Sequence, residues 1–206
     1  MNEKVILKAS KELAEKIPAF NNIFQKHGPP PLWDRKPGFD TLIYIILEQQ
    51  VSLASAKATF DKLSNSIKVT PKNFLTQNDV QLKAFGFSQQ KTRYCRIVAN
   101  KIISGDLNLL ALENQSSQQV KEKLMSITGI GHWTSDIYLL MVLLRPDVWP
   151  HGDRALAVAA YEVFNMDEIP SYEQLKQMAK KWKPWRSVAA RLLWHHYLNT
   201  SRQKRK

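Results

Sequence analysis

One carboxylate stands out for its place in the chain. Asp153 follows the extended-looking segment "DVWPHG" and directly precedes the apolar run "RALAVAA". A fixed carboxylate at such a point can stabilise positive charge that develops in a reaction, and it can orient or deprotonate an attacking water. The same position is typical of a helix N-cap, where the side chain accepts a backbone N–H. The two roles are compatible, because a capping carboxylate is already aimed.

The tripeptide Gly129-Ile130-Gly131 is a second candidate for chemistry. It lies between two helical patterns, residues 117–127 and 132–144, which only four residues separate. So sharp a reversal favours glycine, which tolerates positive φ, and it leaves N–H groups bare where the second helix begins. With the helix dipole, those donors suit a phosphate oxygen, and Ile130 is expected to plug the hairpin. A glycine C-cap followed by an ordinary turn explains the two glycines taken alone.

The composition points to a polyanionic partner. The 206 residues carry 30 Lys and Arg against 18 Asp and Glu, a net charge of +12. Inside a cell the commonest polyanion is a nucleic acid. The apolar runs fall well short of the ~20 residues that span a bilayer, and the N-terminus lacks the apolar core of a signal peptide. Cys95 is the single cysteine, which excludes an internal disulfide and a zinc or iron–sulfur site held by several cysteines. We therefore expect an intracellular protein with no membrane contact.

The elements that position these groups are predicted to be helices. Apolar residues recur at helical spacing, strand patterns are weak, and we expect an all-α fold of about ten helices with short loops. The pattern "KELAEKI" follows Ser10, a strongly apolar helix covers residues 39–49, and the last helix covers residues 185–200. Helix caps are expected at Ser52, Thr70, Ser88 and Ser171.

Five segments, taken in order, resemble the DNA glycosylases that carry a helix-hairpin-helix and a downstream catalytic aspartate. Within that family they are most similar to the 3-methyladenine DNA glycosylase II branch. The segments are "IILEQQVSLASAKATFDKL", "GFSQQKTRYCRIVANKI", "LMSITGIGHWTSDIYLLMVL", "VWPHGDRALAVAA" and "WKPWRSVAARLLWHHYL". The resemblance implies a single domain of two lobes with a cleft between them. Residues 39–145, including the hairpin 117–144, form one lobe, residues 1–38 and 146–200 form the other, and residues 201–206 are a basic tail.

The resemblance also implies a reaction. Such an enzyme flips an alkylated purine, such as 3-methyladenine or 7-methylguanine, out of double-stranded DNA and hydrolyses its N-glycosidic bond. Asp153 matches the catalytic aspartate, which stabilises an oxocarbenium-like transition state and orients water. Lyase-competent relatives have a lysine where this chain has Trp133, so no Schiff base is expected there and the enzyme is expected to be monofunctional. Trp133 and Trp194 match aromatics of the base pocket, although both residues are also of a type that packs in cores.

Further positions follow from the resemblance alone. The carbonyls of Met125, Ile127 and Gly129 match a site for Na⁺ or K⁺ beside a phosphate; no other cofactor and no iron–sulfur cluster is expected. Gln50 stands where some relatives carry an apolar wedge, which leaves weaker wedging, a hydrogen bond to the orphaned base, or simple solvation open. Contacts with double-stranded DNA are expected from Gln49, Gln50, Ser52, Gly129, Ile130, Gly131, His132, Thr134 and Arg154.

Two pocket positions depart from the family pattern, and three rival functions complete the prediction. Ile137 stands where relatives can have a pocket tyrosine, and Arg154 replaces another aromatic, so Arg154 either contacts DNA or pairs with a surface acid. Lys180, Lys181, Lys183 and Arg186 form a solvated face or add to the phosphate-binding field.

The rival functions are the same fold acting on hypoxanthine or on an oxidised or mismatched base, a non-catalytic helix-hairpin-helix DNA-binding module, and a bifunctional glycosylase/lyase. We expect a monomer in the cytoplasm or nucleoid, or in the nucleus of a eukaryote.

Overall fold

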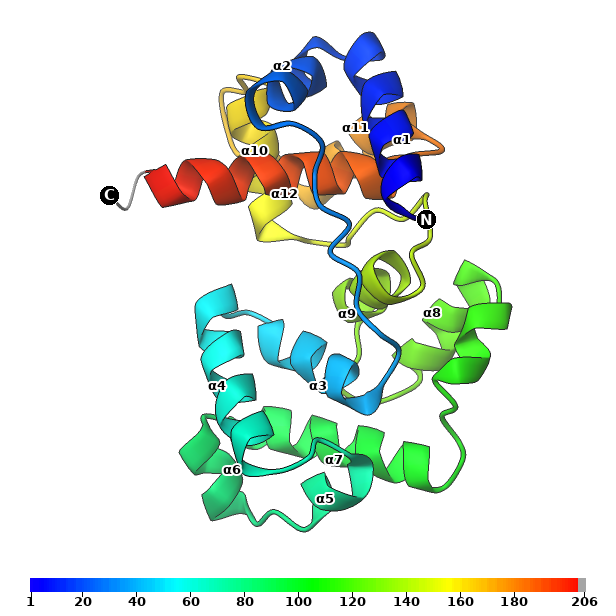
Figure 1. Cartoon of the computed structure of the whole chain (residues 1–206), viewed down its shortest axis with the longest axis vertical. Helices are drawn as coiled ribbons and strands as arrows, with labels where there is room; N and C mark the ends of the chain where they lie inside the picture. Colours follow the sequence, from blue (N-terminus) through cyan, green and yellow to red (C-terminus); the bar gives the residue numbers. More distant parts are fainter. Residues whose placement is uncertain (204–206) are drawn as a thin grey trace. The chain divides into compact units, whose positions relative to one another are not determined.

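The computed structural model describes the backbone of residues 1–203 and the side chains of residues 1–200 (Figure 1). Within these residues there are twelve α-helices and no strand, which confirms the all-α prediction with more helices than the ten expected. The chain forms two compact units: unit 1 is Met1–Asp34 with the chain from Leu139 onward, and unit 2 is Arg35–Tyr138. The lobe boundaries predicted from the sequence lie a few residues further along at each crossing. No helix of the described part is long and apolar enough to cross a membrane.

Unit 1 is built around its last helix. The long α12 packs against α1, α2 and α10, and an aromatic cluster of Phe20, Phe164 and Trp182 lies beside them, with Phe20 5.2 Å from Trp182 between ring centroids. Residues 28–38, which follow α2, and residues 143–153, which precede α10, carry no helix. The helices of this unit are α1 (Glu3–Lys16), α2 (Pro18–His27), α10 (Arg154–Val163), α11 (Tyr172–Ala179), η3 (Lys180–Trp182) and α12 (Arg186–Gln203).

Two ends of unit 1 differ from the prediction. The first helix begins before Ser10, because Asn2 accepts the N–H of Val5 and serves as the N-cap. Ser10 then lies inside α1 and is fully buried. At the other end α12 continues to Gln203, past the predicted end near Thr200. Of the predicted basic tail, residues 204–206 lie outside the described residues.

Unit 2 surrounds the apolar helix α3. Seven of the ten α3 residues are buried, as expected of a helix that neighbours cover on most sides, and α4, α7 and α9 pack against it. Capping boxes at Asn78 with Gln81 and at Ser116 with Gln119 begin two helices, and neither box was predicted from the sequence. The elements are α3 (Phe39–Glu48), α4 (Leu53–Ser66), α5 (Pro71–Leu75), α6 (Asp79–Phe85), α7 (Gln89–Ile103), η1 (Leu110–Asn114), α8 (Ser117–Met125) and α9 (His132–Ile137).

The helix predicted over residues 132–144 changes type halfway. After α9 the chain continues as a π-helical turn, η2 (Tyr138–Val142), and Leu144 has a positive φ of 51°. The N–H of Arg145 donates to the carbonyl of Leu139, six residues earlier. Within this wider turn, the carbonyl of Leu140 accepts a hydrogen bond from outside its own helix.

Arg191 of α12 uses that carbonyl. Its guanidinium is fully buried and donates to the carbonyls of Leu140 (2.8 Å), Leu32 (2.8 Å) and Ser187 (3.1 Å). Burial lowers the pKa of Arg191 to about 10. The chain leaves unit 1 after Asp34 and returns at Leu139. One side chain therefore fixes the backbone just before the exit and just after the return.

Candidate active site and DNA-contact hairpin

Asp153 is the N-cap of α10, as its position in the sequence predicts. Its Oδ1 accepts the N–H of Leu156 at 2.9 Å. The same oxygen accepts the indole N–H of Trp194, from α12, at 3.3 Å. The carboxylate is half-buried, and Trp194 is only 8% exposed. Two N–H donors from different helices thus fix the orientation of one carboxylate beside an aromatic side chain.

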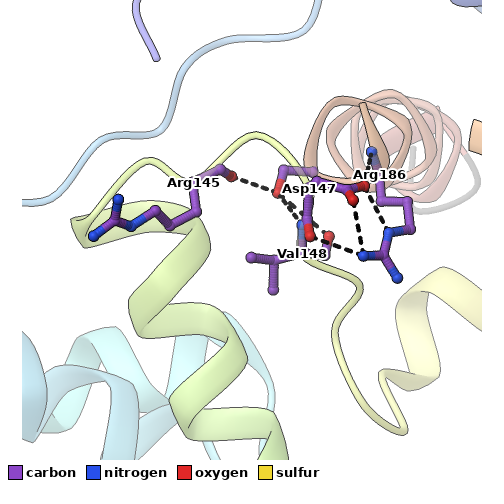
Figure 2. A network of polar contacts seen from close by, with 5 residues as sticks. Arg145, Asp147, Val148 and Arg186 are labelled. Atoms are coloured by element: carbon purple, nitrogen blue, oxygen red, sulfur yellow. Dashed lines mark hydrogen bonds and ion pairs between the residues drawn. The ribbon is translucent and has the colours of Figure 1, made fainter. Parts of the chain in front are cut away.

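The segment that leads into Asp153 is held by the start of α12. Ser187 Oγ accepts the N–H of Val148 at 3.0 Å and donates to the carbonyl of Arg145 at 2.7 Å. Arg186 reaches the carboxylate of Asp147 with Nε at 2.6 Å and Nη2 at 2.9 Å, as Figure 2 shows. The sequence predicted that Arg186 belongs to a solvated face or adds to a phosphate-binding field, whereas the structure places it in an ion pair with Asp147. The extended chain before the cap is fixed without helix or strand.

Two further aromatic contacts stabilise this segment. Trp149 is 7% exposed and packs against Trp182, with 5.0 Å between ring centroids. His151 packs against Tyr172 of α11, with 3.9 Å between ring centroids. The backbone on both sides of Pro150 therefore has a packed neighbour. This packing keeps the cap residue in one place, which electrostatic catalysis requires.

The two glycines of the hairpin have different roles. Gly129 has φ +96°, which glycine tolerates, and a Cβ there would enter the ring of Tyr94 on α7. Gly131 has φ −100°, which any residue adopts, and a Cβ there would meet nothing within 4 Å. Positive φ therefore accounts for the first glycine of the hairpin and not for the second. Gly131 instead leaves open space at the N-terminus of α9, where no side chain caps the helix.

The hairpin is closed by packing and by one ion pair. Ile130 is 3% exposed, as expected of an apolar plug, and its N–H donates to the carbonyl of Ile127 at 3.0 Å. Lys121 of α8 lies 2.8 Å from the carboxylate of Asp136 on α9, and that carboxylate is nearly buried. Such a pair is costly to break, because either partner would lose its counter-charge in a buried setting.

The residues of the loop after α3 that were predicted to contact DNA differ in exposure: one turns into the protein and two are exposed. Gln49 turns inward: its Nε2 donates to the carbonyl of Gly129 and to Oγ1 of Thr134, both at 2.9 Å. Gln50 is exposed and has a positive φ of 57°. Ser52 is exposed and caps α4 through the N–H of Ser55, which confirms its predicted capping role. Thr134, expected to contact DNA, is 2% exposed and accepts from Gln49.

The remaining predicted site residues fall into both units. Trp133 is half-buried on α9 in unit 2, whereas Trp194 and Asp153 belong to unit 1. Ile137 is 2% exposed and lies in the core. His132 and Arg154 are exposed at the first positions of their helices.

Two of the three carbonyls predicted to bind a cation already accept hydrogen bonds. Ile127 O accepts from Ile130, and Gly129 O accepts from Gln49. A carbonyl oxygen has two lone pairs, so each retains one for a hard cation. In the part of the chain that the structure describes, no cluster of three or more His, Cys, Asp or Glu residues could hold a metal ion.

Sequence reasoning missed one cation of unit 2 completely. Lys91 of α7 donates to the carbonyls of Leu47 (2.6 Å) and Gln49 (3.0 Å), at the end of α3. Burial lowers the pKa of Lys91 from its ordinary value. Nothing local in "FSQQKTRYC" distinguishes this lysine, because its partners lie more than forty residues away in sequence.

Comparison with known proteins gives the family. The profile of the HhH-GPD superfamily of base excision DNA repair proteins matches residues 43–184. Alkylbase DNA glycosidase-like protein mag2 of Schizosaccharomyces pombe is 28% identical over 91% of this chain and 92% of its own length. The YfjP protein of Bacillus subtilis is 29% identical over 84% of this chain, and the chain spans 63% of its length, less than two thirds.

Solved structures agree on the fold. Schizosaccharomyces pombe 3-methyladenine DNA glycosylase (Mag1), in complex with abasic DNA, superposes with a TM-score of 0.84 at 24% identity, over 91% of this chain and 95% of that one. DNA-3-methyladenine glycosidase from Bacillus halodurans superposes with a TM-score of 0.73 at 28% identity, over 93% and 89% of the two chains.

Proposed function

Because the chain belongs to the HhH-GPD superfamily of base excision DNA repair proteins, we propose that it is a DNA glycosylase. It hydrolyses the N-glycosidic bond of alkylated purines, 3-methyladenine and 7-methylguanine, in double-stranded DNA. The observation that carries the proposal is the pairing of Asp153 with Trp194: a fixed carboxylate lies beside a nearly buried indole. The names of the relatives, 3-methyladenine glycosylases among them, support the same substrate class.

The carboxylate supplies the chemistry. Breaking an N-glycosidic bond develops positive charge on the sugar, and a negative group held nearby stabilises that transition state more than the ground state. Asp153 is held by Leu156 and Trp194, so it does not reorganise when the charge appears. It also orients the attacking water. The alkylated purine is itself cationic and leaves readily, so one acid suffices.

Aromatic faces supply base selection. A cationic purine is attracted to an indole face by about 0.5–2 kcal/mol, and Trp194 and Trp133 are the two candidates for that role. Trp133 occupies the second position after Gly131, where an amine would be needed for lyase chemistry. We therefore propose a monofunctional enzyme that leaves an uncut abasic site.

The test compares base release by the wild type and by Asp153→Asn, on DNA that carries 3-methyladenine or 7-methylguanine. Asparagine caps a helix as well as aspartate does, so α10 keeps its cap while the negative charge is lost. We expect single-turnover release to fall at least ~100-fold, with binding to an abasic-site duplex retained. The matched control is Ser171→Ala, which removes the cap of α11 in the same unit and leaves release unchanged.

Other outcomes point elsewhere. Tight binding without release by the wild type rejects the alkylpurine substrate, and duplexes with hypoxanthine, oxidised or mismatched bases are then compared. Binding without release on every lesion favours the non-catalytic module. A covalent adduct trapped by borohydride would contradict the monofunctional assignment.

We also propose that the hairpin binds Na⁺ or K⁺ through the carbonyls of Met125, Ile127 and Gly129. The free lone pairs of these oxygens are the ligand type that such a hard cation prefers. Affinity for an abasic-site duplex should fall when Na⁺ and K⁺ are replaced by tetramethylammonium at equal ionic strength. Equal affinity in all three salts would reject the site.

A further inference from the structure

The loop that follows α3, residues 49–52, is anchored at its base. Glu48, the last residue of α3, is 7% exposed and forms a two-point ion pair with Arg35, at 2.7 and 2.8 Å. Paired hydrogen bonds of this kind fix orientation as well as position. The next two residues turn sharply, and Gln50 takes a positive φ of 57°. The chain beyond Glu48 therefore leaves α3 in one direction.

Lys91 makes a second anchor from another helix. Its Nζ donates to the carbonyls of Leu47 and Gln49 at 2.6 and 3.0 Å, where the last carbonyls of a helix lack partners in their own helix. A cation is also favoured at a helix C-terminus by the helix dipole. Lys91 thus spends two of its three N–H donors inside the protein and is half-buried.

Gln49 makes the third contact, and this contact reaches the hairpin. Both N–H donors of its amide are used, on Gly129 O and on Thr134 Oγ1. Gly129 in turn packs against Tyr94, which lies on α7 three residues after Lys91. The loop and the hairpin turn are therefore joined directly by Gln49 and are both supported by α7.

We propose that Gln49 and Lys91 are positioning residues that hold the loop 49–52 and the hairpin turn 128–131 at a fixed spacing, so that both reach one DNA duplex together. The proposal rests on the proposed function and replaces the expected DNA contact of Gln49 with an internal one. Two DNA-facing segments that are already fixed lose little conformational freedom on binding, which raises affinity without any added contact. Gln50, exposed at the tip, is left to face the DNA.

A double-mutant cycle tests the Gln49 link. Gln49→Met and Thr134→Val keep the side-chain shape and remove the hydrogen bond between them. Each should weaken binding to an abasic-site duplex about 10-fold, the scale of one buried hydrogen bond. The double variant should be no more than about 2-fold weaker than the worse single variant, because both remove one link. Multiplied effects would overturn the proposal, since they would mean that Gln49 contacts DNA independently of the hairpin.

Salt dependence tests Lys91. A lysine that neutralises a phosphate contributes about 0.9 to the slope of log K against log salt concentration. Lys91→Met should weaken binding about 10-fold with that slope unchanged. Lys91→Arg, whose guanidinium carries donors for two carbonyls, should restore most of the affinity. The matched control is Lys83→Met, an exposed lysine of α6. A slope that falls by about 0.9 in Lys91→Met would assign Lys91 to a phosphate and overturn its positioning role.

A fluorescence signal separates positioning from simple stability. A 2-aminopurine base beside the abasic site brightens when it unstacks, so it reports entry of the loop into the duplex. At saturating protein, Gln49→Met should give weaker emission than the wild type, because its loop is no longer held against the hairpin. Equal emission at saturation would reject the proposal. All three experiments measure DNA binding alone. If the wild type released no base, the proposed function would be rejected, but the results of these three experiments would still test the positioning roles of Gln49 and Lys91.

Discussion

The Asp153 corner of unit 1 and the hairpin of unit 2 use different parts of the chain for their chemistry. Around Asp153 the functional group is a side chain: its carboxylate accepts from the N–H of Leu156 and from the indole N–H of Trp194. In the hairpin the backbone is the exposed group: Gly131 leaves open space at the start of α9, whereas the side chains of Gln49 and Thr134 bond to each other. A side-chain site should respond to changes of chemical group, and a backbone site to changes of shape.

The largest expected effect comes from shape at the hairpin. Gly129→Ala adds a Cβ at φ +96° that would enter the ring of Tyr94. We expect a loss of about 2–4 kcal/mol in the free energy of unfolding of unit 2, together with most DNA binding. Urea denaturation and binding to an abasic-site duplex measure both. A variant as stable as the wild type would show that the hairpin backbone is not constrained in this way.

A change of chemical group in unit 1 should have the next largest effect. Trp194→Phe keeps a ring but removes the N–H that donates to Asp153, and base release should fall about 10-fold. Trp149→Phe is the matched control, because Trp149 is equally buried and its indole N–H has no hydrogen-bond partner among the described residues. Single-turnover release by the two variants should therefore differ. Equal losses would mean that ring volume, and not the hydrogen bond, matters at Trp194.

Gly131→Ala sharpens the comparison within the hairpin. Its φ of −100° suits alanine and the added Cβ meets nothing, so stability should change by less than about 0.5 kcal/mol. Binding should still fall about 5-fold, because the methyl group would stand at the N-terminal end of α9, where we expect a phosphate to approach. Isothermal titration with an abasic-site duplex checks this expectation. Unchanged affinity would move the phosphate away from this helix end.

The sequence predicted those hydrogen bonds whose two partners lie close together along the chain, and it missed those whose partners lie far apart. Asp153 and Ser52 were correctly predicted as helix caps, because a cap bonds to an N–H only three residues away. The inward turn of Gln49 was missed, since its partner Gly129 is 80 residues away. The same distance argument covers Arg191, whose acceptor Leu32 lies 159 residues earlier. Local patterns specify elements and their ends, whereas these links depend on the assembled unit.

The smallest expected effect concerns acid and again separates the units. Four of the five histidines lie in unit 1, and His27 there has a lowered pKa, caused first by burial and then by Lys26, His195 and His196. As the pH falls below the ordinary value of about 6.5, the unfolded chain takes up a proton that the folded chain resists, so stability falls.

His27→Gln should therefore flatten the loss of stability between pH 7.5 and 5.5. The urea midpoint at the two pH values measures it for the wild type and the variant. The matched control is Gln25→Ala, a change at an exposed, non-titratable position of the same helix, which should leave the acid response unchanged. A larger acid loss in His27→Gln than in the wild type would contradict the sign.

The buried guanidinium of Arg191 also sets an order of events during synthesis. Unit 2 is one continuous stretch of chain, whereas unit 1 joins the first 34 residues to the last third. Leu32 leaves the ribosome early, but its hydrogen-bond donor follows 159 residues later. Glu12 likewise accepts the indole N–H of Trp185, which is synthesised 173 residues later. The first two helices therefore emerge long before their partners, and unit 2 is complete before unit 1 can close.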